Sequence, residues 1–119
     1  MAFRGFRVLL ESSLENRVVT FARLTLRAPS KKLKSNADTG WPDRMFLFSG
    51  GRAAFIEFKK PGEIPKEGEL TKQTHIIERL RNLGFAAEFH DTYEGAVAFL
   101  TYQAALTQAE AIYREACTP

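Results

Sequence analysis

Cysteine and long apolar runs are both scarce in this sequence of 119 residues. Its single cysteine, Cys117, excludes an internal disulfide and is typical of a reducing compartment. No apolar run approaches the length needed to cross a bilayer, and residues 1–10 contain too short an apolar core for a secretory signal. The two histidines, His75 and His90, lack a metal-ligand spacing. We therefore expect a cytoplasmic protein without a membrane segment.

The composition favours one compact domain. With 45% hydrophobic residues, a chain of this length can bury a substantial core. No internal repeat, low-complexity tract or linker divides it, so we expect a single domain over residues 1–119, with a core at about 11–100 and a helical extension at 101–117. The 17 basic and 14 acidic residues give a net charge of +3, which permits a polyanionic partner without requiring one.

Two short apolar runs, residues 45–49 and 53–59, flank the pair Gly50 and Gly51. Both runs contain aromatic residues, and glycine tolerates positive φ, so this pattern predicts a β-hairpin. Alternation along the second strand then separates its side chains between two faces. One face carries Ala54, Ile56 and Phe58, and the other carries Phe55, Glu57 and Lys59.

The length of the hairpin loop decides whether Asp43 joins Glu57 and Lys59. A two-residue turn at 50–51 would pair residue 49 with 52 and place Arg44 opposite Glu57. A three-residue loop at 50–52 would pair 49 with 53 and 43 with 59, so that the three charged side chains share one face. A glycine in such a loop with a bulge is common. We therefore predict a three-residue loop or a bulge here.

Two carboxylates beside an ammonium suggest a metal site for phosphodiester hydrolysis. Glu57 and Lys59 interrupt a very apolar run, AAFIEF, and charges in a buried strand need partners or a metal. Asp43 follows Gly-Trp-Pro, a rigid corner that would fix its carboxylate at the strand entrance. The plainer interpretation is an exposed hairpin with a charged outer face.

A first helix is predicted to begin at Ser12. Ser12 and Glu15 have the capping-box spacing, and Leu14, Val18 and Phe21 follow at helical intervals. Glu15 is therefore either part of this cap or a residue of the metal site, as an outer metal ligand or as an acceptor from a metal-bound water. Glu11, one turn earlier, competes for the second role.

A second helix is predicted to begin after Thr71, with an apolar face ending at Leu83 and with Gly84 just beyond its end. Gln73 lies in its first turn, where it is either exposed or aims its amide at a metal centre. Residues 85–90 then alternate as a strand.

A third helix is predicted to begin at Asp91, because Glu94 three residues later repeats the capping-box spacing. Nothing breaks it between residues 101 and 117, although the sequence does not decide between one helix and two. Its amphipathic tail either closes the core or forms a dimer surface.

The most basic stretch is residues 27–34, around a weak strand signal at Leu33. A solvated loop is the ordinary interpretation of such a charge run. If DNA phosphates are the ligand, basic side chains here and beside the hairpin would contact them and make binding salt-dependent. The candidates are Lys31, Lys32, Lys34, Arg44, Lys60 and Lys72.

The predicted order is helix, strand, hairpin, helix, strand, helix, which is an α/β fold with a small mixed sheet. It resembles the restriction-endonuclease-like core of the PD-(D/E)XK nucleases. The ordered set Glu15, GWPDR at 40–44, FIEFKKPG at 55–62 and LTKQ at 70–73 narrows the resemblance to the stand-alone VRR-NUC domains of phage and bacterial genomes. Two departures are the segment LTLRAP at 24–29, where the family has a glycine turn, and a longer loop at 62–70.

The resemblance implies a Mg²⁺- or Mn²⁺-dependent endonuclease in a bacterial or phage-infected cell. Asp43 and Glu57 would be metal ligands, with Lys59 near the attacking water and with Glu15 and Gln73 completing the site. The backbone carbonyl of Phe58 is a plausible further ligand, because hard divalent ions prefer oxygen. The expected substrate is branched DNA such as a four-way junction, cut by a homodimer to leave 5′-phosphate and 3′-hydroxyl ends. The alternative is a non-catalytic nucleic-acid-binding or phage interaction protein that keeps the fold.

Overall fold

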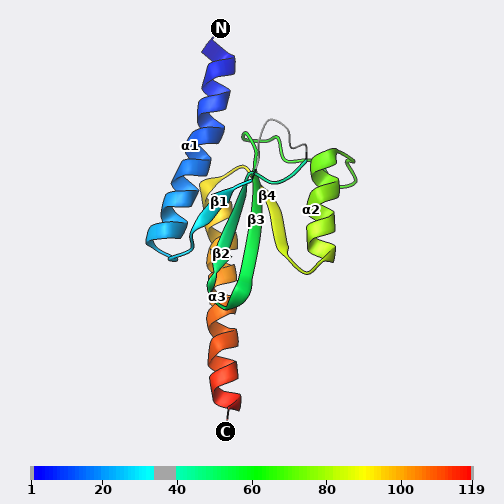
Figure 1. The fold of residues 1–119 in the computed structure, drawn as a ribbon. Helices are drawn as coiled ribbons and strands as arrows, with labels where there is room; N and C mark the ends of the chain where they lie inside the picture. The colour runs from blue at the N-terminus through cyan, green and yellow to red at the C-terminus, as the bar shows by residue number, and fades with distance from the viewer. Residues whose placement is uncertain (1, 34–39, 119) are drawn as a thin grey trace.

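The computed structural model describes residues 2–33 and 40–118, with side chains described from residue 13 onward. Within these residues, three α-helices and four strands follow the predicted order (Figure 1). They are α1 (Ala2–Leu24), β1 (Ser30–Lys32), β2 (Arg44–Phe48), β3 (Arg52–Phe58), α2 (Lys72–Asn82), β4 (Ala86–His90) and α3 (Tyr93–Cys117). The predicted weak strand near Leu33 is β1, which ends one residue earlier.

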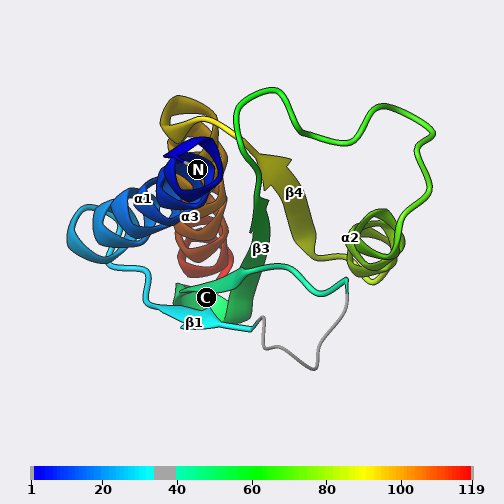
Figure 2. The same cartoon turned by 90° about the horizontal axis from the view of Figure 1, so that it is seen from above.

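The strands form one mixed sheet in the order β1-β2-β3-β4. β1, β2 and β3 are antiparallel neighbours, whereas β4 runs parallel to β3. A parallel pair needs a crossover connection, and α2 supplies it. Viewed from above, α1 and α3 lie on one side of the sheet and α2 on the other (Figure 2). This arrangement is the predicted α/β fold.

The hairpin loop has three residues, as predicted, but it lies at Ser49–Gly51 rather than at 50–52. Phe48 therefore pairs with Arg52, and the predicted pairing of 49 with 53 is wrong. Gly50 and Gly51 both adopt positive φ, at 78° and 81°, a conformation that other residues rarely accept. The observed and predicted registers differ by two residues, so Asp43 still lies on the same face as Glu57 and Lys59, as predicted.

The sheet has a core on each face, as the alternation along β3 predicts. Ile56 and its neighbours of the same parity pack with Val18 of α1 and Leu100 of α3. Phe55 packs on the opposite face with Ile77 and Leu80 of α2. The face that carries Phe55 is the one on which Glu57 and Lys59 were predicted. Glu57 and Lys59 therefore belong to the face of the sheet on which α2 packs.

The starts of the first and third helices were predicted wrongly. α1 begins at Ala2, so Ser12 lies inside the helix and does not cap it. Nothing in residues 2–11 stops a helix, and a capping-box spacing inside a helix-compatible run does not by itself define an end. α3 is capped by Thr92, whose hydroxyl accepts from the Gly95 amide at 3.1 Å. Asp91 instead accepts from the backbone amide of Gly62 at 2.8 Å.

The second helix begins as predicted. Thr71 caps α2 and exchanges reciprocal hydrogen bonds with Thr74, and Gly84 follows its end with φ of 97°. The buried face of α2 consists of Ile77 and Leu80, while Leu83 is 65% exposed and does not belong to it.

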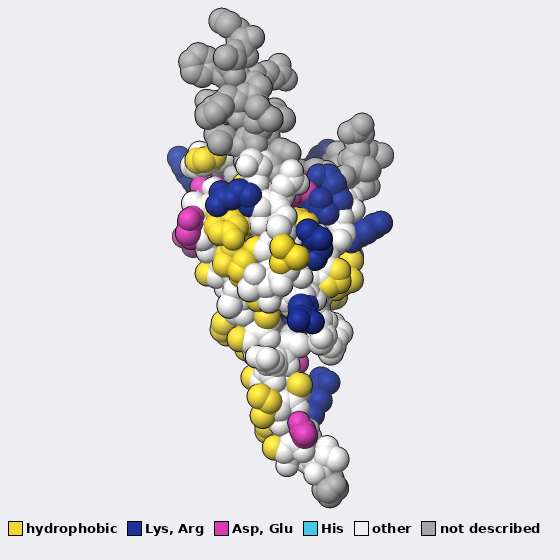
Figure 3. Space-filling model, turned by 90° about the vertical axis from the view of Figure 1, so that its left-hand side faces the viewer, with side chains coloured by type: hydrophobic (Ala, Val, Ile, Leu, Met, Phe, Trp, Pro, Cys, Tyr) yellow, Lys and Arg dark blue, Asp and Glu magenta, His cyan; other side chains and the backbone are white. Residues whose placement is uncertain are grey.

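α3 is one continuous helix of 25 residues. Its first half buries Ala96, Phe99, Leu100 and Gln103. Its second half runs past the sheet and tapers away from the body of the molecule (Figure 3). No helix in the described ranges is both long and apolar enough to cross a membrane.

Candidate metal centre

Asp43 and Glu57 lie at the same level of the β2–β3 hairpin. Arg44 pairs with Ile56, and one further step of that register brings Asp43 opposite Glu57. Both carboxylates are buried, at 8% and 2% exposed. Asp43 Oδ2 accepts a hydrogen bond of 2.9 Å from the backbone amide of Phe58. The β3 backbone therefore holds the Asp43 carboxylate next to Glu57.

Gln73 links Glu57 to Lys59. Its amide nitrogen donates to Glu57 Oε2 at 2.7 Å, and its amide oxygen accepts from Lys59 Nζ. Lys59 Nζ also lies 3.7 Å from Glu57 Oε2. The backbone amide of Lys59 donates to the carbonyl of His90 at 2.9 Å, which fixes this end of β3 against β4. The structure thus brings together four of the five predicted catalytic residues.

Gly40 sets the position of α2 relative to Asp43. It has φ of 92°, and a Cβ placed there would lie 2.8 Å from the carbonyl oxygen of Lys72. Gln73 follows Lys72 in the first turn of α2, and Trp41 and Pro42 connect Gly40 to Asp43. Gly40 is the first residue of the motif GWPDR, but no role was predicted for it. Close packing of Gly40 against Lys72 holds Gln73 beside the carboxylates.

Replacing Gly40 by alanine should reduce the free energy of unfolding more than the same change at Gly50. Both residues have positive φ, but Gly50 has nothing within 4 Å of an added Cβ. Backbone strain alone costs about 1–3 kcal/mol, so the excess loss in Gly40→Ala measures the contact with Lys72. Urea unfolding of the two variants checks this. Equal losses would show that Gly40 is needed only for its backbone conformation.

Glu15 is held by two cations. Its Oε2 accepts from Arg44 Nε at 2.8 Å and from Lys32 Nζ at 3.1 Å. The predicted cap is wrong, because Glu15 lies inside α1. Nor is it grouped with Asp43 and Glu57, since in the described ranges no three Asp, Glu, His or Cys side chains cluster as metal ligands. Its role as an outer ligand stays a prediction.

The predicted DNA contacts fall into three groups. Lys32 and Arg44 are neighbours across β1 and β2 and are engaged by Glu15. Lys31 and Lys72 are exposed, and Lys60 is half-buried. In the sequence, Lys72 adjoins Gln73 and Lys60 adjoins Lys59. Lys34 lies outside the described residues. The contacts of Glu15 with Arg44 and Lys32 join residues far apart in the sequence, so no local pattern could reveal them.

The donor set of the centre fits a hard divalent ion. Asp43 and Glu57 offer carboxylate oxygens, and neither the histidines nor Cys117 belongs to the group. Structural zinc sites are usually closed by four nitrogen or sulfur ligands, whereas Mg²⁺ is commonly bound through one or two carboxylates and keeps several waters. The residues present therefore suit Mg²⁺ or Mn²⁺ better than zinc.

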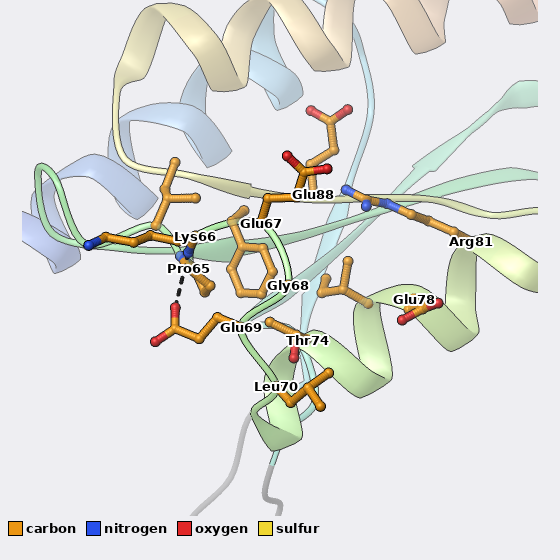
Figure 4. A pocket seen from close by; sticks show the side chains of 13 residues that line it. Pro65, Lys66, Glu67, Gly68, Glu69, Leu70, Thr74, Glu78, Arg81 and Glu88 are labelled. Atoms are coloured by element: carbon orange, nitrogen blue, oxygen red, sulfur yellow. Dashed lines mark hydrogen bonds between the residues drawn. The ribbon is translucent and has the colours of Figure 1, made fainter.

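A separate cavity of about 580 Å³ lies between the loop before α2, α2 itself and β4 (Figure 4). Among the side chains that line it, four are acidic and two are basic. They are Glu67, Glu69, Glu78, Glu88, Lys66 and Arg81. The excess of negative charge does not suit a phosphate backbone. The cavity is lined by neither Asp43 nor Glu57, so it is separate from the candidate metal centre.

The four-stranded mixed sheet and its three helices are consistent with the restriction-endonuclease-like fold that the sequence predicted. No protein-family model and no curated protein matches this sequence. A solved structure described as a VRR_NUC domain is similar, with a TM-score of 0.56 and 21% sequence identity. The similarity covers 74% of this chain and 95% of that one. The chain therefore has the VRR-NUC fold, as the sequence predicted.

Proposed function

We propose that this protein is a divalent-metal-dependent endonuclease that hydrolyses phosphodiester bonds in DNA. The observation that carries the proposal is the group formed by Asp43, Glu57, Lys59 and Gln73 within a VRR-NUC fold. A buried pair of carboxylates next to an ammonium is costly to keep in a small domain unless it is compensated. Metal binding and phosphate chemistry give such a group a use.

Asp43 and Glu57 would hold the ion, with the backbone carbonyl of Phe58 as a third oxygen donor. The amide of Phe58 already fixes Asp43, so little side-chain freedom remains to be lost on binding. A bound Mg²⁺ or Mn²⁺ would lower the pKa of a coordinated water and neutralise charge on the phosphate. Gln73 restrains the Glu57 carboxylate from the α2 side.

Lys59 would act on the reacting phosphate and water. Its ammonium is held by the Gln73 amide oxygen and lies close to Glu57. It is only 19% exposed, so its interactions are screened less than those of a surface lysine. From this position it would orient the attacking water and stabilise the negative charge that grows on the phosphate oxygens. Glu15 would complete the site only if its carboxylate gave up its hydrogen bonds with Arg44 and Lys32.

For the substrate, we propose branched DNA such as a four-way junction, cut by a homodimer to give 5′-phosphate and 3′-hydroxyl ends. Lys60 and Lys72, which adjoin Lys59 and Gln73 in the sequence, and Lys31 of β1 would contact phosphates rather than bases, as would Lys32 and Arg44. A two-fold symmetric pair would present two sites to two strands, which suits a symmetric junction.

The direct test is cleavage of a labelled four-way junction, a flap and a plain duplex with Mg²⁺, Mn²⁺ or EDTA. We expect cleavage with either metal, none with EDTA, and a faster rate on the junction than on the duplex. Analysis of the product ends would identify the phosphate and hydroxyl termini. Binding of all three DNAs without cleavage under any metal would favour the alternative, a binding protein that keeps the fold.

A further inference from the structure

An apolar stripe runs along the solvent side of α3. At 100° per residue, seven apolar positions in the second half of the helix fall within about 120° of one another. They are Tyr102, Ala105, Leu106, Ala109, Ile112, Tyr113 and Ala116. The residues that α3 buries lie on a neighbouring face of the helix, with Leu100 opposite the middle of the stripe and Phe99 next to its edge at Leu106.

The stripe is exposed over most of its length. Tyr102, Ile112 and Tyr113 are 61%, 65% and 71% exposed, and only Leu106 is half-buried. In the space-filling view, hydrophobic side chains follow the tapering end of the molecule (Figure 3). Scattered exposed apolar residues are ordinary, but a continuous stripe of this kind marks a surface that binds another protein or a membrane.

The charges around the stripe favour a protein helix over DNA or a membrane. None of the seven positions is charged, so the stripe offers nothing to a phosphate backbone. Arg114 is the one basic residue on the polar side of residues 102–117, against Glu110 and Glu115, whereas helices that lie on membranes are rich in lysine and arginine there. Glu110 is moreover paired with Arg52 of the hairpin.

We propose that the stripe pairs with the same stripe of a second copy, with the two α3 helices antiparallel and a two-fold axis at Ala109. This register places Tyr102 of one copy against Ala116 of the other. It also brings Ala105 and Leu106 together with Ile112 and Tyr113, and it leaves Ala109 facing its own copy. Each tyrosine thus meets an alanine, Leu106 meets Ile112, and the smallest pair lies where the helices cross most closely. A self-complementary surface of this kind is what a two-fold interface requires.

This interface rests on the homodimer of the proposed function and names its surface, but it does not depend on cleavage. The stripe contains none of the proposed catalytic residues, so dimerisation can be measured on a chain that cuts nothing. If the chain does cut DNA, the interface fixes how the two candidate metal centres are presented to a substrate. An inactive dimer would refute the proposed cleavage alone, and an active monomer would refute the homodimer and its interface but not the cleavage.

Light scattering coupled to size exclusion tests the association. We expect a concentration-dependent dimer that Ile112→Lys converts to a monomer at all concentrations tested. Ala111→Lys is the matched control, because Ala111 is exposed but lies about 160° from Ala109 on the helix. A wild-type monomer at every concentration, or a dimer that survives Ile112→Lys, would overturn the proposal. Urea unfolding of both variants would show that the domain still folds.

Disulfide cross-linking tests the arrangement. In a Cys117→Ser background, Ala109→Cys should give a covalent dimer on mild oxidation, since close helix packing brings facing Cα atoms to roughly disulfide distance. Ala116→Cys should not, because in the antiparallel pair the two positions lie about 21 Å apart along the helices. Cross-linking through both positions would indicate a parallel pair and refute the proposed axis. Cross-linking through Ala111→Cys as readily as through Ala109→Cys would refute the interface.

Discussion

Replacing Lys59 by alanine is expected to lower the rate of DNA cleavage by roughly 10²–10³-fold, the usual loss when one donor to a developing negative charge is removed. DNA affinity should change little, because one phosphate contact contributes only a part of the electrostatic binding. The ammonium lies beside Gln73 and Glu57, where it would act on the reacting phosphate rather than on the DNA backbone at large. Single-turnover cleavage and a binding titration in EDTA separate the two quantities.

Two controls make this result specific. Lys60→Ala removes the ammonium of the neighbouring residue, which is half-buried, and should mainly weaken binding and its salt dependence. Lys59→Met keeps the bulk of the side chain without its charge and should be as slow as Lys59→Ala. Lys59→Arg should not restore the rate, because a planar guanidinium cannot take the place of the compact ammonium. Equal effects of Lys59→Ala and Lys60→Ala on cleavage would contradict the assignment.

Asp43→Asn separates metal binding from the action of Lys59. The asparagine carbonyl oxygen can still accept from the Phe58 amide, so the local fold should persist. The loss of a carboxylate should weaken the binding of Mn²⁺, whereas Lys59→Ala should leave it intact. Calorimetric titration with Mn²⁺ in the absence of DNA measures this directly. Unchanged Mn²⁺ affinity in Asp43→Asn would remove Asp43 from the ligand set.

The sequence predicted the fold well where local pattern and tertiary packing agree. Alternation along residues 53–59 assigned Ile56 and Phe55 to opposite faces, and each face has its own helical layer. Thr71 was identified as a cap because it is followed at once by an amphipathic run. The burial of Glu57 and Lys59 was predicted from the same strand, because these charged residues interrupt an apolar run that must be covered in the folded protein.

Predictions failed where a local signal had more than one outcome. The capping-box spacing at Ser12 is also compatible with a helix that starts earlier. The third helix is capped by Thr92 and not by its neighbour Asp91. The loop position was missed by one residue because Ser49 joins the glycines in the turn. The pairing of Glu15 with Arg44 is a contact across 29 positions, which no spacing rule could supply.

Replacing Phe46 by alanine is expected to reduce the free energy of unfolding by about 3–5 kcal/mol, the range for deleting a buried aromatic ring. Phe46 is fully buried in β2, where it packs in the core formed with α1 and α3. A domain of this size has a total stability of about 5–15 kcal/mol, so the variant should unfold at a much lower urea concentration. The midpoint and slope of urea unfolding measure the loss.

Leu47→Ala is the matched control, because Leu47 is the next residue along β2 but is 41% exposed. Its truncation should cost about 1 kcal/mol or less, as for most partly exposed sites. A shift of the β2 register by one residue would exchange the two positions between core and solvent. The same shift would move Asp43 away from Glu57. A larger loss for Leu47→Ala than for Phe46→Ala would therefore refute both the sheet register and the proposed metal centre that depends on it.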